Sequence, residues 1–409
     1  MQIDLKKKFR IYYNKVTKSI AFYPAIIAIG FLGLSWVMLE IDFSEQGREL
    51  KAKMSWLTLK DADTARSIIS TIAGAILALT VFSFSMVMIV LNQAASQMSN
   101  RVLSSMIGNR FQQTVLGFYI GTIVYSLFLL STIRDLSSGI SVPALSIYLL
   151  IVLTVVAIFL FIYFLDYVTQ TVKYETVIDR VQTQTMLVME KTFTENKTAI
   201  VDWCSLPFIE ITMRRSAYFQ HFNDENLILL AQKHDLFFDF KHAKGTFVLK
   251  DIVILKVYSR NTIDKKLVSK IISEIDFFKG QPIDQNVIYG FKQLAEIAIK
   301  ALSPGINDPG TAVLALQSLF DLFSFMLFHH FPQVLQDENK IARLFIPFPT
   351  FEELFKTCVY PIWNYGKTDQ YIQVELRELI LQIQLVDAAN EHESLFLGVL
   401  HEIENQINL

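Results

Sequence analysis

The organisation of this chain follows from one stretch, Ser67–Leu91, which reads SIISTIAGAILALTVFSFSMVMIVL. The run is apolar throughout and carries no charged side chain. It is longer than the ~20 residues that a helix needs to cross the hydrocarbon core of a bilayer. We therefore predict a membrane-spanning helix over 66–91. Neither Gly nor Pro follows until residue 108, so the helix is expected to continue into water, to about residue 107.

Small and polar side chains gather on one side of this helix when the residues are placed at about 100° per residue. The stripe comprises Thr71, Gly74, Ala75, Ala78, Phe82, Ser85, Ile89, Asn92, Gln93, Ser96 and Asn100. All of these except Gly74 and Ala75 are candidates to line a pore. The opposite side is almost wholly apolar, so something other than lipid is expected to face the stripe.

Two interpretations of the stripe stay open. Small residues let neighbouring membrane helices approach closely, so the stripe can be a packing surface. Alternatively, it lines a water-filled path in a homo-oligomer, where Ser85, Asn92, Gln93 and Ser96 offer polar groups to a solute. The two are compatible, because a packing face can lie beside a pore face.

The composition suits a membrane protein with a sizeable soluble part. Of the 409 residues, 19% are charged, and there are 33 phenylalanines. The net charge of -2 gives no reason to expect nucleic acid as a partner. The only two cysteines, Cys204 and Cys358, fall in the part that we place in the cytosol, where disulfides are rare.

Four spans are predicted within a transmembrane domain over 20–165, at 20–39, 66–91, 114–133 and 144–165. The segment 1–19 is basic, so the positive-inside rule keeps it in the cytoplasm, where it can lie against anionic lipid. The loops 40–65 and 134–143 are then external, and both termini are cytoplasmic. We expect a multi-pass membrane protein.

The remaining chain predicts a cytosolic α+β domain. A helical linker is expected over 166–200, a small β-rich module over 206–260 and a helical domain over 263–409. In the module, Asp224 is expected to cap a helix over 225–233, and Asp264 is expected to cap the next helix.

A loop at Ser303–Pro309, SPGINDP, is the best candidate for a site outside the membrane. Pro304-Gly305 suits a type II turn, and Asp308 followed by Pro309 is a typical helix start. A turn between helices needs these residues for structural reasons alone. The functional alternative is that Ser303, Asn307 and Asp308 meet a ligand, a cation or a neighbouring subunit.

Several segments resemble a family of uncharacterised bacterial integral-membrane proteins, grouped only as a domain of unknown function. They are Gln293–Ala298 leading into Ala301–Pro309, Val90–Arg101 with its Gln97 and Arg101, Phe348–Leu354 and Tyr365–Asp369. The likeness covers nearly the whole chain and departs at Ala217, where relatives tend to carry Gly. The resemblance implies a fold and a membrane location, and no established activity.

We expect no enzyme, because no nucleophile elbow, P-loop or dinucleotide motif is present, and we expect no cofactor or metal, because the seven histidines lack ligand spacing. The spans hold no ionisable residue in their apolar cores, which favours a passive channel over a pump. Arg66, Arg101 and Arg110 flank the spans, and Arg66 and Arg101 could form cationic rings, although both lie off the stripe. The leading hypothesis is a homo-oligomeric channel, lined by the second span and gated by the cytosolic domain. The alternative is a membrane-anchored scaffold or sensor, whose cytosolic domain binds a protein or a small ligand and which transports nothing.

Overall fold

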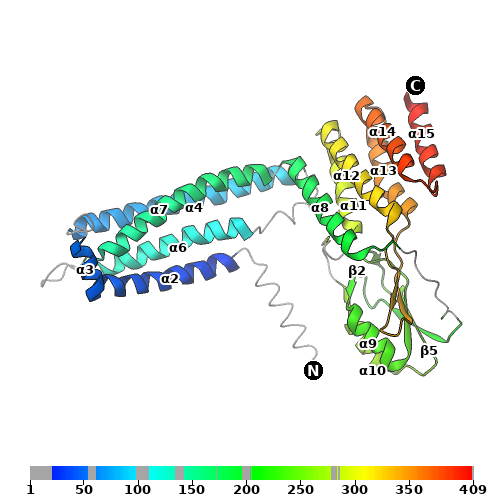
Figure 1. Cartoon of the computed structure of the whole chain (residues 1–409), viewed down its shortest axis with the longest axis horizontal. Coiled ribbons are helices and arrows are strands. Elements are labelled where there is room, and N and C mark those ends of the chain that lie inside the picture. The colour runs from blue at the N-terminus through cyan, green and yellow to red at the C-terminus, as the bar shows by residue number, and fades with distance from the viewer. Residues whose placement is uncertain are drawn as a thin grey trace. The chain divides into compact units, whose positions relative to one another are not determined.

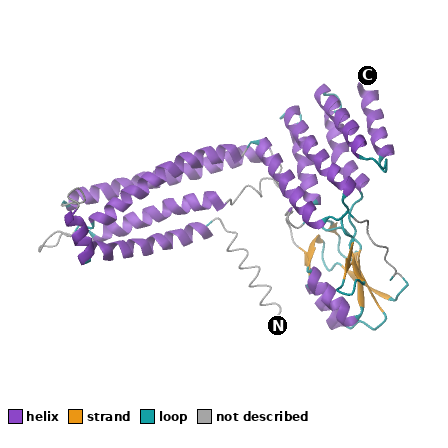
Figure 2. Ribbon diagram, viewed as in Figure 1, coloured by secondary structure: helices purple, strands orange, loops and turns teal. Residues whose placement is uncertain are grey.

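The computed structural model describes residues 21–53, 61–97, 110–133, 142–171, 173–195, 203, 205–277, 283 and 286–407. These residues divide into two compact units, which meet in the sequence between Lys173 and Tyr174. Figure 1 labels the elements, and Figure 2 shows that the strands are confined to one region of the second unit.

The first unit is helical. Its elements are α2 (Phe22–Phe43), α3 (Glu45–Lys53), α4 (Ala62–Gln97), α6 (Arg110–Thr132) and α7 (Ala144–Thr171). The four long helices match the four predicted spans, but α2 and α7 extend beyond 20–39 and 144–165, and α4 begins four residues before residue 66. Helix α4 does continue past Leu91, as far as Gln97; the rest of the predicted extension to 107 lies outside the described residues.

Helix α6 is the central helix of this unit. In its most apolar window 44% of the residues are buried, against 11% for both α2 and α4. Helix α6 packs most extensively against α2 and also contacts α7. Helix α4 runs beside α7 (Figure 1), and ring contacts such as Phe82 with Phe161 join the two. Most of the surface of α4 is therefore not covered by the other described helices of the first unit.

Glycines explain the close approach of α6 to α2. A Cβ added to Gly117 would lie 2.7 Å from the Ile27 Cδ1 atom, and one added to Gly121 would lie 2.7 Å from the Phe31 ring. Two glycines four residues apart on one helix form the GxxxG pattern that brings membrane helices together. The chain thus uses small-residue packing inside the protomer, at a position that the sequence analysis did not single out.

The second unit begins with α8 (Tyr174–Thr192), which packs on α11 (Ile288–Ala301) and α12 (Pro309–Phe328). Gly290 of α11 lies against Thr185 of α8 so closely that an added Cβ would meet the threonine hydroxyl at 1.8 Å. The predicted linker over 166–200 is therefore not one helix. Its first residues end α7, and α8 belongs to the core of the second unit.

The strands form two sheets. The five-stranded sheet has the order β1-β5-β3-β8-β7, with only β3 and β8 parallel, and the three-stranded sheet has the order β4-β2-β6. The strands are β1 (Phe208–Thr212), β2 (Ala217–Phe222), β3 (Leu236–Phe240), β4 (Phe247–Val248), β5 (Val253–Ser259), β6 (Ile275–Phe277), β7 (Val334–Gln336) and β8 (Ala342–Phe345). Helices α9 (Asp224–His234) and α10 (Lys265–Ser273) complete this region.

The expected boundary between a β-rich module at 206–260 and a helical domain from 263 is wrong in detail. Strands β6, β7 and β8 come from the part expected to be helical, and Leu344 pairs with Phe238 across more than a hundred residues. These three strands are only three or four residues long, so each is too short for a periodic pattern. The remaining helices are α13 (Phe351–Gly366), α14 (Gln370–Val386) and α15 (Glu393–Ile407).

A buried arginine fixes β8 to its surroundings. The Arg343 guanidinium donates to Asp337 at 2.9 Å and to Asp235 at 2.8 Å. Burial raises the pKa of Asp337, but hydrogen bonds from Arg343 and from two backbone N–H groups outweigh it and hold this pKa below its usual value. The ion pair is thus a structural element of the second unit.

Two of the three predicted helix caps are confirmed. Asp264 and Asp308 accept hydrogen bonds from backbone N–H groups three residues on, at 2.7 Å and 3.1 Å, and cap their helices as predicted. The cap of α9 is Asn223 rather than Asp224, which is the first helical residue.

Candidate functional site

The predicted stripe of α4 lies on the outside of the first unit. Thr71, Ala78, Ser85 and Asn92 are exposed. The two large members, Phe82 and Ile89, are 54% and 64% exposed. The buried side chains of α4 are Ala62, Ala65, Ile69, Ile76 and Ser83. The side chains of Gln93 and Ser96, and the whole of Asn100, lie outside the described residues.

The outward face has two halves. Toward the start of α4 the stripe residues have only small side chains, although Leu77 beside them is 54% exposed, and a Cβ added to Gly74 would have nothing within 4 Å. Toward the other end it carries Phe82, Ser85 and Ile89. The Ser85 hydroxyl donates to the Val81 carbonyl oxygen at 2.9 Å, so it is satisfied within its own helix.

The flanking arginines do not point to a shared ring. Arg66 is partly buried and pairs with Asp63 at 3.3 Å. Arg110 begins α6 and lies over the Tyr23 ring, with 5.9 Å from the guanidinium carbon to the ring centroid. Both cations thus interact within their own protomer. Arg101 lies outside the described residues.

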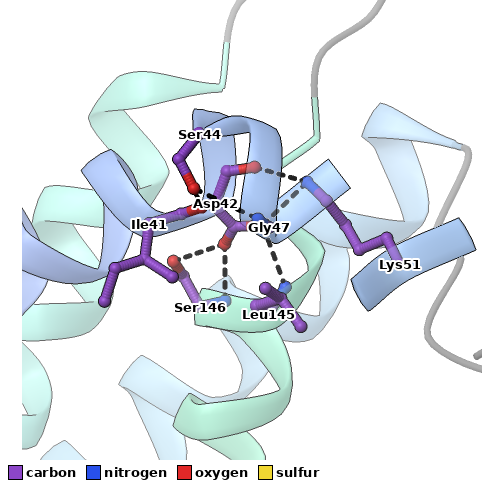
Figure 3. Close-up of polar contacts among 7 residues, drawn as sticks. All are labelled: Ile41, Asp42, Ser44, Gly47, Lys51, Leu145 and Ser146. Atoms are coloured by element: carbon purple, nitrogen blue, oxygen red, sulfur yellow. Dashed lines mark hydrogen bonds and ion pairs between the residues drawn. The ribbon is translucent and has the colours of Figure 1, made fainter. Parts of the chain in front are cut away.

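A buried carboxylate, Asp42, is a site that the sequence analysis missed. Residue 42 was expected in an external loop, but it lies in the last turn of α2 and is fully buried. Its carboxylate accepts hydrogen bonds from the Leu145 N–H at 3.2 Å, from the Ser146 N–H at 2.7 Å and from the Ser146 hydroxyl at 2.6 Å. Figure 3 shows these donors converging on the carboxylate from the start of α7.

The charge of Asp42 is balanced from two sides. The Lys51 ammonium lies 3.0 Å from one carboxylate oxygen and donates to the Asp42 carbonyl oxygen at 2.7 Å. The first turn of α7 adds the positive end of a helix dipole. A tight turn between α2 and α3 brings Lys51 back, and Gly47 permits it, because an added Cβ would lie 2.0 Å from the Ile41 carbonyl oxygen. No local pattern around residue 42 signals this site, since its main partners lie about one hundred residues away.

The loop at Ser303–Pro309 is a tightly bonded helix connection. The N–H groups of Ile306 and Asn307 both donate to the Ser303 carbonyl oxygen at 2.9 Å. The backbone N–H of Asp308 donates to the Ala301 carbonyl oxygen at 2.8 Å. The left-handed residue is Asn307, with φ 50°, whereas Gly305 has no positive φ. The predicted type II turn at Pro304-Gly305 is therefore wrong, because such a turn needs a positive φ at Gly305.

The three candidate residues of this loop have different surroundings. The Ser303 hydroxyl donates to the Lys300 carbonyl oxygen at 2.6 Å, and the Asp308 carboxylate receives the Thr311 hydroxyl at 2.6 Å. Asn307 is exposed. Burial raises the pKa of the Tyr174 hydroxyl, and the charge of Asp308 raises it further, so the loop lies close to the start of α8.

A groove of about 270 Å³ lies between α8 and α12. Glu175, Asp179, Gln182, Gln317 and Ser318 line it together with two apolar side chains. The two carboxylates are exposed, four residues apart on α8. Ser318 is 7% exposed. The described residues hold no group of three or more His, Cys, Asp or Glu side chains that could bind a metal ion.

Comparison with known proteins adds the family. Residues 17–382 match the family described as "Predicted membrane protein (DUF2254)". Uncharacterised proteins of Mycobacterium bovis and Mycobacterium tuberculosis are each 22% identical over an alignment of 327 residues, and the alignment covers 77% of this chain and 63% of the relative. The chain thus spans less than two thirds of the length of these relatives. No solved structure matches. Since the family match covers most of the sequence, the resemblance is confirmed, and the chain belongs to the DUF2254 family of predicted membrane proteins, whose function is unknown.

Proposed function

We propose that this protein is a homo-oligomer of a bacterial inner membrane, in which copies of α4 face one another around a passive path for ions or small solutes. The observation that carries the proposal is the outward position of the α4 stripe. The cytosolic unit would then assemble or gate the path.

The contrast between two sets of small residues supports this assembly. Gly117 and Gly121 are in close contact with α2, whereas Gly74 of α4 has open space around it. In lipid, helix association depends on close van der Waals packing, which small residues make available. A second α4 could supply the contacts that the protomer leaves unused.

The proposal includes four membrane spans. Five helices are long and apolar enough to cross a membrane, and the fifth is α12. We assign α2, α4, α6 and α7 to the membrane and α12 to the core of the second unit. In support, 61% of the apolar window of α12 is already buried there, between α8, α11, α13 and α14. The basic segment 1–19 favours cytoplasmic ends.

A passive path fits the chemistry of α4 better than an active one. Ser67–Asn92 carries no ionisable side chain. The buried charge of Asp42 is paired with Lys51, near the end of α2. Proton-coupled carriers need titratable groups along the path. The polar stripe residues Thr71, Ser85 and Asn92 are neutral.

The mass of the purified protein in lipid nanodiscs tests the assembly. We expect several copies for the wild type and a monomer for Gly74→Leu, because the added side chain would separate the facing helices. Gly33→Leu is the matched control, since Gly33 of α2 also has nothing within 4 Å of an added Cβ. A monomeric wild type would refute the shared path.

Liposome flux tests the transport. Small ions should leave vesicles with the wild-type protein faster than empty vesicles, and Asn92→Leu should slow the release. Ser131→Leu serves as the control, because Ser131 is an exposed serine on α6, away from the stripe. Flux equal to that of empty vesicles would remove the channel and leave the scaffold or sensor.

The groove between α8 and α12 favours the sensor as the second candidate. Its two exposed carboxylates, Glu175 and Asp179, suit a small organic cation. Calorimetric titration with spermidine checks this: Glu175→Gln with Asp179→Asn should abolish binding, and Glu402→Gln with Glu404→Gln, which removes the same charge from α15, should not. Equal loss in both variants would mean non-specific charge attraction.

A further inference from the structure

Two turns of the second unit form one exposed tip, which the function proposed above does not use. The first turn joins β1 to β2, and the second joins β4 to β5. Three hydrogen bonds tie them: Met213 N–H to the Ile252 carbonyl oxygen and Asp251 N–H to the Met213 carbonyl oxygen, both at 2.9 Å, and Lys250 N–H to the Ser216 hydroxyl at 3.0 Å. The two turns therefore hold one another in place.

Large apolar side chains project from this tip into solvent. Phe247 is 50% exposed, Leu249 is 60% exposed and Ile252 is 45% exposed. The Phe247 ring also contacts the partly exposed Tyr218, with 5.0 Å between ring centroids. Exposed apolar groups collected at one place mark an interaction site more often than scattered ones do.

The same tip carries an excess of positive charge. Arg214, Arg215 and Lys250 are exposed, and the one acid in these two turns is Asp251, at 3.8 Å from the Lys250 ammonium. Neither arginine forms an ion pair within the described residues. The tip therefore has a net charge of about +2 beside its apolar side chains.

Apolar side chains next to free basic ones suit an anionic membrane surface. The apolar groups enter the boundary between headgroups and acyl chains, and the basic groups lie against lipid phosphates. A tip built from two turns also offers little of the area of about 800 Å² per partner that a stable protein interface needs. The chain belongs to a family of predicted membrane proteins, so a bilayer is a partner to which the second unit is already tethered.

We propose that this tip docks on an anionic bilayer surface, with Phe247, Leu249 and Ile252 inserted and Arg214, Arg215 and Lys250 against the lipid phosphates. The inference is independent of the assembly through α4, because a single protomer can dock in this way. It gives the second unit a membrane contact besides its covalent connection to α7.

The test uses the full chain in nanodiscs, with a fluorescent probe attached to Leu249→Cys in a Cys204→Ser background. Cys358 is fully buried and is not expected to be labelled. With phosphatidylglycerol in the bilayer, the probe emission should shift to the blue, and spin-labelled lipids should quench it. With phosphatidylcholine alone, both effects should be lost.

Two controls make the result specific. A probe at Leu385→Cys, on an 85% exposed leucine of α14, should not be quenched. Replacing Arg214, Arg215 and Lys250 by Gln should reduce the ratio of docked to undocked protein by about fivefold for each charge removed. Quenching of equal size in phosphatidylglycerol and in phosphatidylcholine bilayers would overturn the proposal. A blue shift without quenching by spin-labelled lipid would also overturn it, and would mean that a protein surface covers the tip.

Discussion

Replacement of Asp42 by Asn should strongly destabilise the first unit. The side chain keeps its size and loses its charge. The new amide NH₂ group then faces donors of the first turn of α7, and Lys51 loses the partner of its charge. The buried position leaves no water to replace either interaction.

The expected magnitude follows from the contacts. Asp42 accepts three hydrogen bonds at 2.6–3.2 Å and forms one ion pair at 3.0 Å. A hydrogen bond to a charged group contributes about 1.5–3 kcal/mol, but Asn still accepts one of them. Breaking a buried ion pair on one side costs about 3–5 kcal/mol, and we expect a loss in this range. For a unit of this size the loss corresponds to a fall in apparent Tm of roughly 10 °C.

Recovery of folded protein after heating in detergent, followed by size-exclusion chromatography, measures this change. Glu40→Gln is the matched control, because Glu40 lies on the same helix and is exposed, and among the described residues its carboxylate accepts only the Trp36 indole N–H, at 3.2 Å. In the double variant Asp42→Asn with Lys51→Met, the fall in Tm should be smaller than the sum of the falls in the two single variants, since no unpaired charge remains. If Asp42→Asn changes Tm no more than Glu40→Gln does, the carboxylate does not hold α2 to α7.

Three further predictions concern the second unit. Gly290→Ala should lower the free energy of unfolding of the second unit by about 1–3 kcal/mol in a denaturant titration, because the added Cβ would lie 1.8 Å from a threonine hydroxyl of α8. Gly305→Ala is the control: its added Cβ meets nothing within 4 Å, so the free energy of unfolding should change little. Arg343→Met should destabilise the unit at neutral pH. The pKa of Asp337 is lower in the folded state than in the unfolded state, so its contribution is complete above about pH 4 and is lost as the pH falls through the folded pKa; acid titration should show this loss in the wild type and a smaller one in Arg343→Met. Burial raises the pKa of the Cys358 thiol to about 12, so in a Cys204→Ser background maleimide at pH 7.5 should modify the protein only after unfolding, and rapid modification of the folded variant would contradict the buried position of Cys358.

The helices of the first unit were the most predictable part of this protein. A run such as Ser67–Leu91 carries its own signal, because length and apolar character alone decide whether a helix can cross a bilayer. The caps at Asp264 and Asp308 were equally predictable from the sequence, since each side chain accepts a hydrogen bond from a backbone N–H only three residues away. The stripe of α4 could also be predicted, because it depends only on the spacing of residues along one helix. Its position on the outside of the first unit could not be predicted.

Long-range contacts account for what was missed. Strand β8 forms because Leu344 pairs with Phe238, and four residues are too few for a sequence pattern that would predict this pairing. Asp42 looked like a loop residue, because an acid near the end of an apolar run usually faces water. Its carboxylate is buried only because α7 presents two N–H groups and a hydroxyl to it.

The sequence by itself determined the long apolar helices, the main helix caps and the family, since all of these depend on residues close together in the chain. Only the tertiary structure decided which small residues are already packed, as at Gly121, and which are still uncovered, as at Gly74. It alone also placed Asp42 in a pocket of donors and gathered the basic and apolar side chains of the β1–β2 and β4–β5 turns at one tip. The physical reason is that a side chain's local pattern sets what it can contact, whereas the packing of distant segments sets which contact it makes.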